Sequence, residues 1–262
     1  MSLVRAKKHL GQHFLTDKNI AKKIVEALNP EDRFQLVLEV GPGMGVLSDF
    51  LLQDRRYKTW MIDLDAESVA YLAGKYPAMG NKLILGDFLD LNFSSTFNGP
   101  MAIIGNFPYN ISSQILFKVL DNRHQVVEVV GMFQKEVAER CTALPGGKEY
   151  GILSVFLQAY YEVQYLFTVK AGAFNPPPKV LSGVIRLLRN NTVALNCNEQ
   201  LFWKVVKAGF NQRRKTLRNA LSVIISKDKM KNHPLLELRA ERLGVDDFVM
   251  LTNEIETWQH NR

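Results

Sequence analysis

The sequence predicts an α/β fold: a mostly parallel sheet with helices on both faces, followed by a small all-α domain. Three observations predict this fold. Short apolar runs of β-type residues alternate with helical patterns from Leu36 to about Leu120. The first of these runs ends in a glycine-rich turn, Gly41–Gly45. After Arg189 the β-type pattern fades into short helical patterns. Such alternation is typical of a parallel sheet, which binds its ligand beyond the carboxyl ends of its strands, where the strand order reverses.

The predicted strands and helices follow one another at short intervals. Between the last two strands lies Phe174–Lys179, whose three consecutive prolines cannot join a helix or a central strand and therefore predict an exposed, extended loop. The predicted strands are Leu36–Val40, Lys58–Asp63, Lys82–Leu85, Met101–Gly105, Val126–Phe133, Glu162–Val169 and Gly183–Leu188. The predicted helices before residue 190 are Val46–Gln53, Ala66–Lys75, Ser112–Asp121, Gln134–Thr142 and Ile152–Tyr160.

The chain is long enough for one large domain and one small domain. It has 262 residues, of which 47% are hydrophobic, so it can fill a substantial core. The polar segment Asn190–Asn198 is typical of a linker. We therefore predict two domains, at residues 1–189 and 190–262.

The composition excludes several classes of protein. No apolar stretch approaches the roughly 18 residues that a membrane helix needs, and the amino-terminal residues lack the apolar core of a secretory signal. Cys141 and Cys197 lie far apart, and the histidines show no metal-ligand spacing. We expect a monomeric, reduced, cytoplasmic protein that holds no metal ion and contacts no membrane.

The positive charge is concentrated in two segments. The net charge is +7, and residues 5–23 carry six bases, Lys8 among them, against one acid. Residues 204–231 carry nine bases against one acid. A segregated basic surface suits a polyanion such as RNA, because each neutralised phosphate releases counterions. The alternative is two solvated helix faces, and charge alone leaves both open.

A glycine-rich turn and two aspartates stand at successive strand ends. Gly41 and Gly43 let the backbone approach a ligand closely at a helix amino terminus. A dinucleotide-binding turn would have a third glycine where this chain has Val46. Asp63 ends the second strand, where a carboxylate accepts ribose hydroxyls, and Asp87 follows the third, where it suits an adenine amine. In this order the three features resemble class I S-adenosylmethionine-dependent methyltransferases.

The segment after the fourth strand points to methylation of an adenine amine. The Asn106 amide oxygen and a backbone carbonyl beside Pro108 would each accept one N–H of the N6 amine, which draws it toward tetrahedral geometry and directs its lone pair at the methyl donor. Pro108 has no N–H of its own to compete. The ring of Tyr109 would stack on an extruded base. The spacing Asn-x-Pro-Tyr resembles the RNA adenine variant of the amino-methyltransferase signature.

Phe174, just ahead of the three prolines, is a candidate for the opposite face of the base. A second stacking contact of this kind is worth roughly 1–3 kcal/mol. The alternative is a loop phenylalanine that fills the core.

A predicted helix after residue 210 offers cations for RNA phosphates. Arg214 and Arg218 are spaced to lie on one face, while Leu217 and Leu221 pack inward. The alternative is that the long side chains cover the interface of their own domain. The candidate phosphate-binding residues are Arg213, Arg214, Lys215 and Arg218.

Seven segments spread over nearly the whole chain resemble one family, the ribosomal RNA small subunit adenine dimethyltransferases A. The later segments are the specific ones, because the glycine-rich turn is shared by many methyltransferases. The segments are Lys7–Leu15, Glu39–Gly43, Gly105–Ser112, Gln134–Arg140, Phe174–Val180, Phe210–Asn219 and Arg239–Leu243.

The resemblance implies a Rossmann-like class I methyltransferase that dimethylates two adjacent adenosines in the 3′-terminal hairpin of 16S rRNA, within a small ribosomal subunit or its precursor. This chain departs from the family at three positions: His13 replaces a common Asn, Asp63 a common Glu, and Phe107 a common Leu. None of the three removes essential chemistry. The resemblance further implies that S-adenosylmethionine contacts His13, Leu15, Gly41, Asp63, Asp87 and Asn106.

Two other functions compete with this one. An Erm-like 23S rRNA adenine methyltransferase would share the chemistry of Asn106–Tyr109, but Phe210–Asn219 and the helical tail favour the 16S enzyme. A non-catalytic ribosome assembly factor of the same fold would be free to lose Asn106 or Tyr109, and this chain has both.

Overall fold

The computed structural model describes residues 4–7, 10–31 and 33–260, so Lys8 and His9 of the amino-terminal segment lie outside the described residues. Two compact units make up these residues. One holds the residues up to Glu139 together with Glu162–Arg189, and the other holds Arg140–Tyr161 and the residues from Asn190 onward. The predicted boundary at residue 190 coincides with a change of unit. Residues 140–161, which we predicted in the first domain, group with the second unit.

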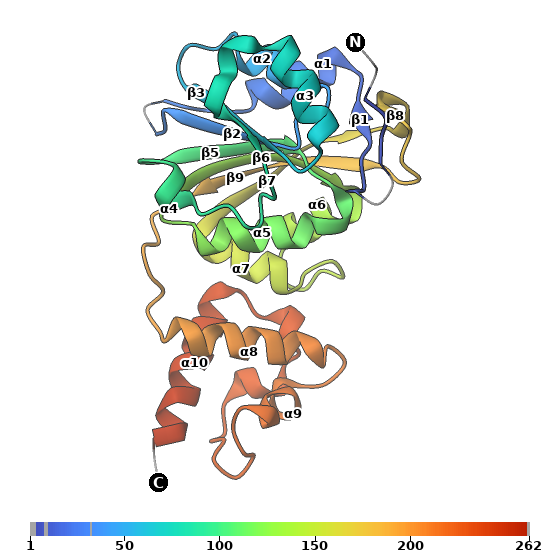
Figure 1. The fold of residues 1–262 in the computed structure, drawn as a ribbon. Helices are drawn as coiled ribbons and strands as arrows, with labels where there is room; N and C mark the ends of the chain where they lie inside the picture. Colours follow the sequence, from blue (N-terminus) through green and yellow to red (C-terminus); the bar gives the residue numbers. More distant parts are fainter. Residues whose placement is uncertain (1–3, 8–9, 32, 261–262) are drawn as a thin grey trace. The chain divides into compact units, whose positions relative to one another are not determined.

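Within the described residues, the first unit is built on a seven-stranded sheet with the order β4-β3-β2-β5-β6-β9-β7 (Figure 1). Its strands are β2 (Leu36–Val40), β3 (Lys58–Asp63), β4 (Leu83–Leu85), β5 (Met101–Asn106), β6 (Val126–Gln134), β7 (Tyr161–Val169) and β9 (Ser182–Arg189). β2 pairs in parallel with β3 on one side and with β5 on the other, and β5 pairs in parallel with β6. β9 runs antiparallel to β6. The predicted mostly parallel sheet is confirmed, and its order reverses between β2 and β5.

Helices cover both faces of this sheet, as predicted. α1 (Lys18–Glu26), α2 (Ser48–Leu51) and α3 (Ala66–Lys75) lie on one face, and α5 (Ser112–Asp121) lies on the other (Figure 1). α4 (Phe93–Thr96) is a single turn before β5. α3 and α5 have the bounds that the sequence predicted, whereas α2 is shorter than predicted.

The amino-terminal segment contains a helix that we did not predict. Asp17 caps α1 by accepting hydrogen bonds from the backbone N–H groups of Asn19 (2.9 Å) and Ile20 (3.1 Å). The buried residues of α1 include Ala21 and Ile24, which are three positions apart and so lie on the same face of the helix. Just before α1, β1 (Phe14–Leu15) pairs antiparallel with β8 (Phe174–Asn175), which ties this segment to the loop ahead of the prolines.

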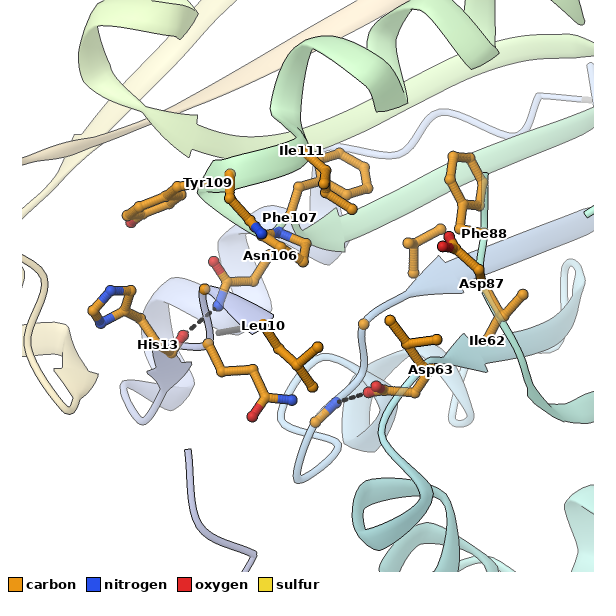
Figure 2. A pocket seen from close by; sticks show the side chains of 18 of the residues that line it. Leu10, His13, Ile62, Asp63, Asp87, Phe88, Asn106, Phe107, Tyr109 and Ile111 are labelled. Atoms are coloured by element: carbon orange, nitrogen blue, oxygen red, sulfur yellow. Dashed lines mark hydrogen bonds between the residues drawn. The ribbon is translucent and has the colours of Figure 1, made fainter. Parts of the chain in front are cut away.

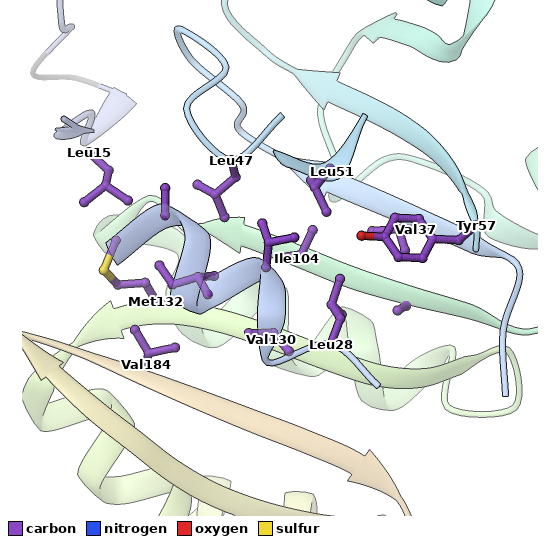
Figure 3. Packing of buried hydrophobic residues seen from close by; sticks show 14 of the residues in the cluster. Leu15, Leu28, Val37, Leu47, Leu51, Tyr57, Ile104, Val130, Met132 and Val184 are labelled. Carbon is purple, nitrogen blue, oxygen red and sulfur yellow. The ribbon is translucent and has the colours of Figure 1, made fainter. Parts of the chain in front are cut away.

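The core of the first unit lies between the sheet and the helices α1 and α2. Figure 3 shows Leu28 and Leu51 directed at sheet residues such as Ile104 and Val130. Each of these side chains is at most 4% exposed. Burial of this kind stabilises a fold by roughly 25 cal/mol per Å² of apolar surface, so the sheet forms a rigid base for the loops at its carboxyl edge.

The second unit is helical. Its helices are α7 (Ile152–Tyr160), α8 (Glu199–Asn211), α9 (Leu217–Ala220) and α10 (Val245–His260), and it also takes in the end of α6 (Lys135–Thr142). Aromatic rings hold it together: Phe156 lies 3.8 Å from Trp203, and Phe210 lies 6.0 Å from both Tyr150 and Phe248, measured between ring centroids. None of the helices that the structure describes combines the length and the apolar character needed to cross a bilayer.

Candidate active site

A cavity opens at the carboxyl ends of β2, β3, β4 and β5, where the strand order reverses (Figure 2). This is the location that the alternation of strands and helices predicts for a ligand. Loops after each of these strands and the amino-terminal segment supply its walls. Among the predicted site residues, those that line the cavity are His13, Gly41, Gly43, Asp63, Asp87, Asn106, Pro108 and Tyr109.

Two predicted site residues, Leu15 and Phe174, do not line the cavity. They are direct partners in the β1–β8 pair, so their side chains project to the same side. Both are 4% exposed and belong to the hydrophobic core cluster. In this structure Phe174 occupies the core, as the alternative has it, and its stacking on the base stays a prediction. The burial of Leu15 leaves only its backbone for the implied contact with the cofactor, which stays a prediction.

The glycine-rich turn after β2 has a backbone that only glycine adopts easily. Gly41, Gly43 and Gly45 have φ angles of 67°, 55° and 78°. A Cβ atom on Gly43 would lie 2.8 Å from the ring of Phe14. A tertiary contact also holds the turn: the Tyr76 hydroxyl donates a hydrogen bond to the Gly45 carbonyl at 3.0 Å. The backbone of this turn is thus fixed at the edge of the cavity.

Asp63, at the end of β3, faces the same turn. Its Oδ2 accepts a hydrogen bond from Gly43 N–H at 3.1 Å, and its Oδ1 accepts one from Asp65 N–H at 2.9 Å. Burial raises the pKa of the Asp63 carboxyl, and these backbone hydrogen bonds oppose that rise. The carboxylate is oriented before any ligand binds.

Asp87 follows β4 and provides a second carboxylate in the cavity, in addition to that of Asp63. Its Oδ1 accepts a hydrogen bond from Leu89 N–H at 2.8 Å. Apolar Ile62 and Phe88 line the cavity near the two carboxylates, with Ile62 on the side of Asp63 and Phe88 beside Asp87 (Figure 2). Two carboxylates in a cavity with apolar walls fit an adenosine group, which offers ribose hydroxyls at one end and an exocyclic amine at the other. Within the part of the chain that the structure describes, no three His, Cys, Asp or Glu side chains are grouped as metal ligands.

Asn106, the last residue of β5, is oriented by the amino-terminal segment. Its Nδ2 donates to the backbone carbonyl of His13 at 2.7 Å. Figure 2 shows the amide oxygen turned away from this bond, on the side of Tyr109. Because the amide nitrogen is already bonded, the oxygen is the group that the side chain presents as an acceptor.

The backbone carbonyl of Phe107, the residue after Asn106, is a second possible hydrogen-bond acceptor. The carbonyl of Pro108 accepts hydrogen bonds from Ile111 N–H and Ser112 Oγ, both at 3.3 Å. The carbonyl of Phe107, directly before the proline, accepts none from any described residue. This is the carbonyl beside Pro108 that the sequence predicts as a partner for an amine. The ring of Phe107 itself is buried and packs on Phe133.

Tyr109 is half-buried at the mouth of the cavity. Its ring is stacked on that of His13, with centroids 5.6 Å apart and planes at 29°. His13 is held in turn by a 2.8 Å hydrogen bond between its Nδ1 and the Pro176 carbonyl. Ser182, which the sequence analysis did not single out, lies 2.6 Å from the Tyr109 hydroxyl.

Most of the amino-terminal wall of the cavity was not predicted from the sequence. Leu10, Gln12 and Phe14 line it beside His13. An ion pair of 2.6 Å between Lys7 and Asp65 holds this wall to the start of α3. No local periodicity reveals such contacts between distant segments. The only local signal was Asp65 in the position of a helix cap.

The basic residues after residue 212 do not form the predicted arginine-rich helix. α8 ends at Asn211, Gln212 is non-helical (φ −117°, ψ 47°), and Thr216 is the extended cap of α9. Arg213, Arg214 and Lys215 therefore lie in a turn, whereas Arg218 lies in α9, and the predicted common face of Arg214 and Arg218 is corrected. Leu217 and Leu221 are fully buried, as predicted.

Two of these four bases already have partners within the second unit. Arg218 pairs with Glu237 at 2.8 Å, and Arg213 lies 3.8 Å from Glu241 and donates to the carbonyls of Gly147 and Lys148. The side chains of Arg214 and Lys215 are exposed. These last two are the better placed to meet a phosphate.

Known proteins resemble this chain over nearly its whole length. Residues 3–256 match the model of the family described as ribosomal RNA adenine dimethylase. The ribosomal RNA small subunit methyltransferase A of Cytophaga hutchinsonii is 56% identical over 253 residues, which cover 97% of this chain and 98% of that protein. The protein of the same name from Phocaeicola vulgatus is 51% identical over 264 residues, covering 100% of this chain and 94% of its own length.

Solved structures agree with these relatives. A dimethyladenosine transferase from Plasmodium falciparum superposes with a TM-score of 0.78 at 26% identity, covering 94% of this chain and 98% of its own. The 23S rRNA methyltransferase ErmE superposes with a TM-score of 0.67 at 23% identity, covering 93% of this chain and 99% of its own, and so shares the fold. On the family match and the close relatives together, the chain belongs to the ribosomal RNA adenine dimethylase family.

Proposed function

We propose that the protein transfers methyl groups from S-adenosylmethionine to N6 of two adjacent adenosines in the 3′-terminal hairpin of 16S rRNA, during assembly of the small ribosomal subunit. Its relatives that are 51% and 56% identical are named for the small subunit. The observation that carries the proposal is the pair of acceptors, Asn106 Oδ1 and the Phe107 carbonyl, beside Tyr109 at a nucleoside-sized cavity.

The cofactor, when bound, supplies a methyl group made electrophilic by a positively charged sulfur. Asp63 would accept hydrogen bonds from the ribose hydroxyls of the cofactor, and Asp87 would accept one from the amine of its adenine. Gly41 and Gly43 present backbone at close range because neither carries a Cβ atom. His13 contributes its backbone and ring to the opposite wall.

The residues of the Asn106–Tyr109 segment hold the target amine. Its lone pair is delocalised into the purine ring, so it is a weak nucleophile until its geometry changes. Hydrogen bonds to Asn106 Oδ1 and the Phe107 carbonyl pull the amine toward tetrahedral geometry and direct the lone pair at the methyl group. Tyr109 stacks on the extruded base. The product loses a proton readily to water, so catalysis consists of positioning and electrostatics.

The second part of the proposal concerns RNA. The region 190–262 binds the rRNA backbone, and exposed Arg214 and Lys215 neutralise phosphates there. We also propose that the protein acts as a monomer. The free thiols of Cys141 and Cys197 suit the reducing conditions of the cytoplasm.

One experiment tests the proposal directly. The protein is incubated with methyl-labelled cofactor and unmethylated small subunits, and the label is mapped by mass spectrometry. We expect N6,N6-dimethyladenosine at two adjacent positions of the 3′-terminal hairpin. Label on a ring carbon or a ribose would contradict the chemistry.

Two controls separate the competing functions. Primer extension on rRNA from a deletion strain should lose its stop in 16S rRNA, whereas loss of a stop in 23S rRNA would favour the Erm-like alternative. No transfer at all, with binding to small subunits retained, would favour the non-catalytic assembly factor.

A further inference from the structure

The Tyr109 hydroxyl is held by a serine from β9, two strands away from β5 at the same edge of the sheet. Tyr109 Oη and Ser182 Oγ are 2.6 Å apart, and Ser182 is fully buried at the start of β9. Burial raises the pKa of the Tyr109 hydroxyl, so it stays protonated and can donate or accept in this bond. A buried hydroxyl pair is short, directional and shielded from water.

Ser182 is itself immobilised by the sheet. It is the register partner of Gln134 in the β6–β9 pair, and Met132, two residues earlier on β6, is the register partner of Asn106 on β5. Two consecutive strand pairs therefore connect Ser182 to Asn106. The distance between the hydroxyl of Ser182 and the backbone that carries Asn106 is fixed by backbone hydrogen bonds of the core.

The segment Asn106–Tyr109 is thus restrained at both ends. At one end, Asn106 Nδ2 donates to the His13 carbonyl at 2.7 Å. At the other, the tip of Tyr109 meets Ser182, while one face of its ring lies against His13. Without the hydroxyl contact, a half-buried ring on a 3₁₀ turn could rotate about its side-chain bonds, and this freedom would be lost each time a base stacks on it.

We infer that Ser182 is a positioning residue for methyl transfer, which acts through Tyr109 by fixing the plane on which the target adenine stacks. The inference rests on the proposed function, because it needs a base to stack there. Ser182 does not line the cavity, so it leaves the affinity for the cofactor unchanged. Its effect falls on the RNA side of the reaction, in the fraction of bound adenines that meet the methyl group in line.

A double-mutant cycle tests the inference. Ser182→Ala, Tyr109→Phe and the double variant are compared with the wild type in single-turnover methylation of unmethylated small subunits at saturating cofactor. Each single change should slow transfer by about 3–10-fold, the effect of one lost hydrogen bond. The double variant should be no slower than the slower single variant, because both changes remove the same contact. The dissociation constant of S-adenosylhomocysteine should stay within about twofold in all three, since the hydrogen bond lies outside the cofactor contacts.

Matched controls come from the same unit. Ser182→Thr keeps the hydroxyl and should restore most of the rate. Thr168→Ala removes the hydroxyl from an exposed Tyr165–Thr168 pair of 2.8 Å and should leave the rate unchanged. If Ser182→Ala does not fold, Tyr109→Phe and Ser182→Thr still test the contact from both sides.

Three results would overturn the inference: a wild-type rate in Ser182→Ala, additive losses in the double variant, or an equal loss of cofactor affinity and rate. Failure of the proposed function gives a different result, since the wild type itself would then place no methyl group on the hairpin while still binding S-adenosylhomocysteine.

Discussion

The side chain of Asn106 shows how a single residue is prepared for its role. An asparagine amide has a donor end and an acceptor end of similar shape, and only the oxygen can hold an adenine N–H. The bond from Nδ2 to the His13 carbonyl, 2.7 Å long, determines which end faces the cavity. The backbone of a segment about ninety residues away in sequence therefore determines that the Asn106 oxygen, and not its nitrogen, faces the cavity. The sequence identified Asn106 but could not identify the group that orients it.

Phe107 shows how a departure from the family is accommodated. The ring occupies space beside Gly131 on β6, where a Cβ atom would collide with it, and it lies 5.0 Å from the ring of Phe133. The larger side chain thus fits because the neighbouring strand has no side chain at that point.

Asp63 should govern affinity for the cofactor more than rate. Asp63→Asn places an NH₂ group against the N–H of Gly43 or Asp65, so one of two hydrogen bonds becomes a repulsive donor–donor contact. We expect the dissociation constant of S-adenosylhomocysteine to rise by about tenfold or more, with the rate at saturating cofactor within about twofold. Isothermal titration measures the first quantity. Asp90→Asn, on an exposed turn, is the control, and an unchanged affinity in Asp63→Asn would remove Asp63 from the site.

At the scale of elements, the proposed site residues lie in the turns at the carboxyl edge of the sheet. The sequences of these turns were the ones that indicated the function. β2, β3, α3, α5 and α7 have the bounds that the sequence predicted, because buried alternation and helical periodicity are local signals. The arginine-rich segment was predicted wrongly as a helix. Its residues favour helix locally, but Leu217 N–H donates to the Leu238 carbonyl at 2.8 Å, a tertiary contact that turns the chain at Thr216.

Gly43 tests the glycine-rich turn. Gly43→Ala adds a methyl group at φ 55°, 2.8 Å from the ring of Phe14. Gly99→Ala is a matched control, because its φ is 79° but no atom lies within 4 Å of the added carbon. Both variants should lose about 1–2 kcal/mol of stability from the left-handed backbone. Only Gly43→Ala should also lose cofactor affinity, as measured by titration and thermal unfolding; equal affinities in the two variants would contradict the close approach at Gly43.

The turn between α8 and α9 should contribute to RNA binding through charge. Replacing both Arg214 and Lys215 by Ala should weaken binding to unmethylated small subunits and reduce the slope of log affinity against log salt by about 1 per lost contact. Filter binding over a series of salt concentrations measures that slope. Lys58→Ala, exposed at the amino end of β3 and thus at the edge of the sheet opposite the cavity, is the control. A slope identical to that of the wild type would mean that these two residues meet no phosphate.

At the scale of the whole molecule, the fold class and the catalytic edge could be predicted, but most of the wall built by the amino-terminal segment, apart from His13, could not. Residues 10–14 reach the cavity only because Lys7 pairs with Asp65 and β1 pairs with β8. For the same reason the sequence could not decide between the two alternatives for Phe174, which pairs with Leu15 and lies with it in the core. Contacts between distant segments leave no periodic trace in the sequence.

Global stability should depend on pH through Glu39. This side chain is fully buried beneath the glycine-rich turn, Ser48 Oγ donates to its Oε2 at 2.5 Å, and burial raises its pKa to about 8. A carboxyl whose pKa is raised from 4.5 to about 8 by folding binds its proton more tightly in the folded state. Its contribution to stability is therefore complete below pH 4.5 and is lost as the pH rises toward 8.

Glu39→Gln removes that dependence because glutamine is neutral at every pH. The free energy of unfolding of the variant, minus that of the wild type, should grow as pH rises from 5 to 8, by at most about 1.4 kcal/mol per pH unit. Urea unfolding at several pH values measures this difference. Glu26→Gln, at a 61% exposed side chain, is the control. A difference that does not change with pH would show that Glu39 is ionised in the folded protein.

The central claim is that Asn106 and the carbonyl after it hold the target amine during transfer. Its most direct test is the single-turnover rate of Asn106→Ala on unmethylated small subunits, measured with the affinity for S-adenosylhomocysteine. We predict a rate lower by roughly 10²–10³-fold, the order of a lost hydrogen bond in a transition state, with a much smaller change in cofactor affinity. A wild-type rate in Asn106→Ala would contradict the claim and move the site of chemistry elsewhere.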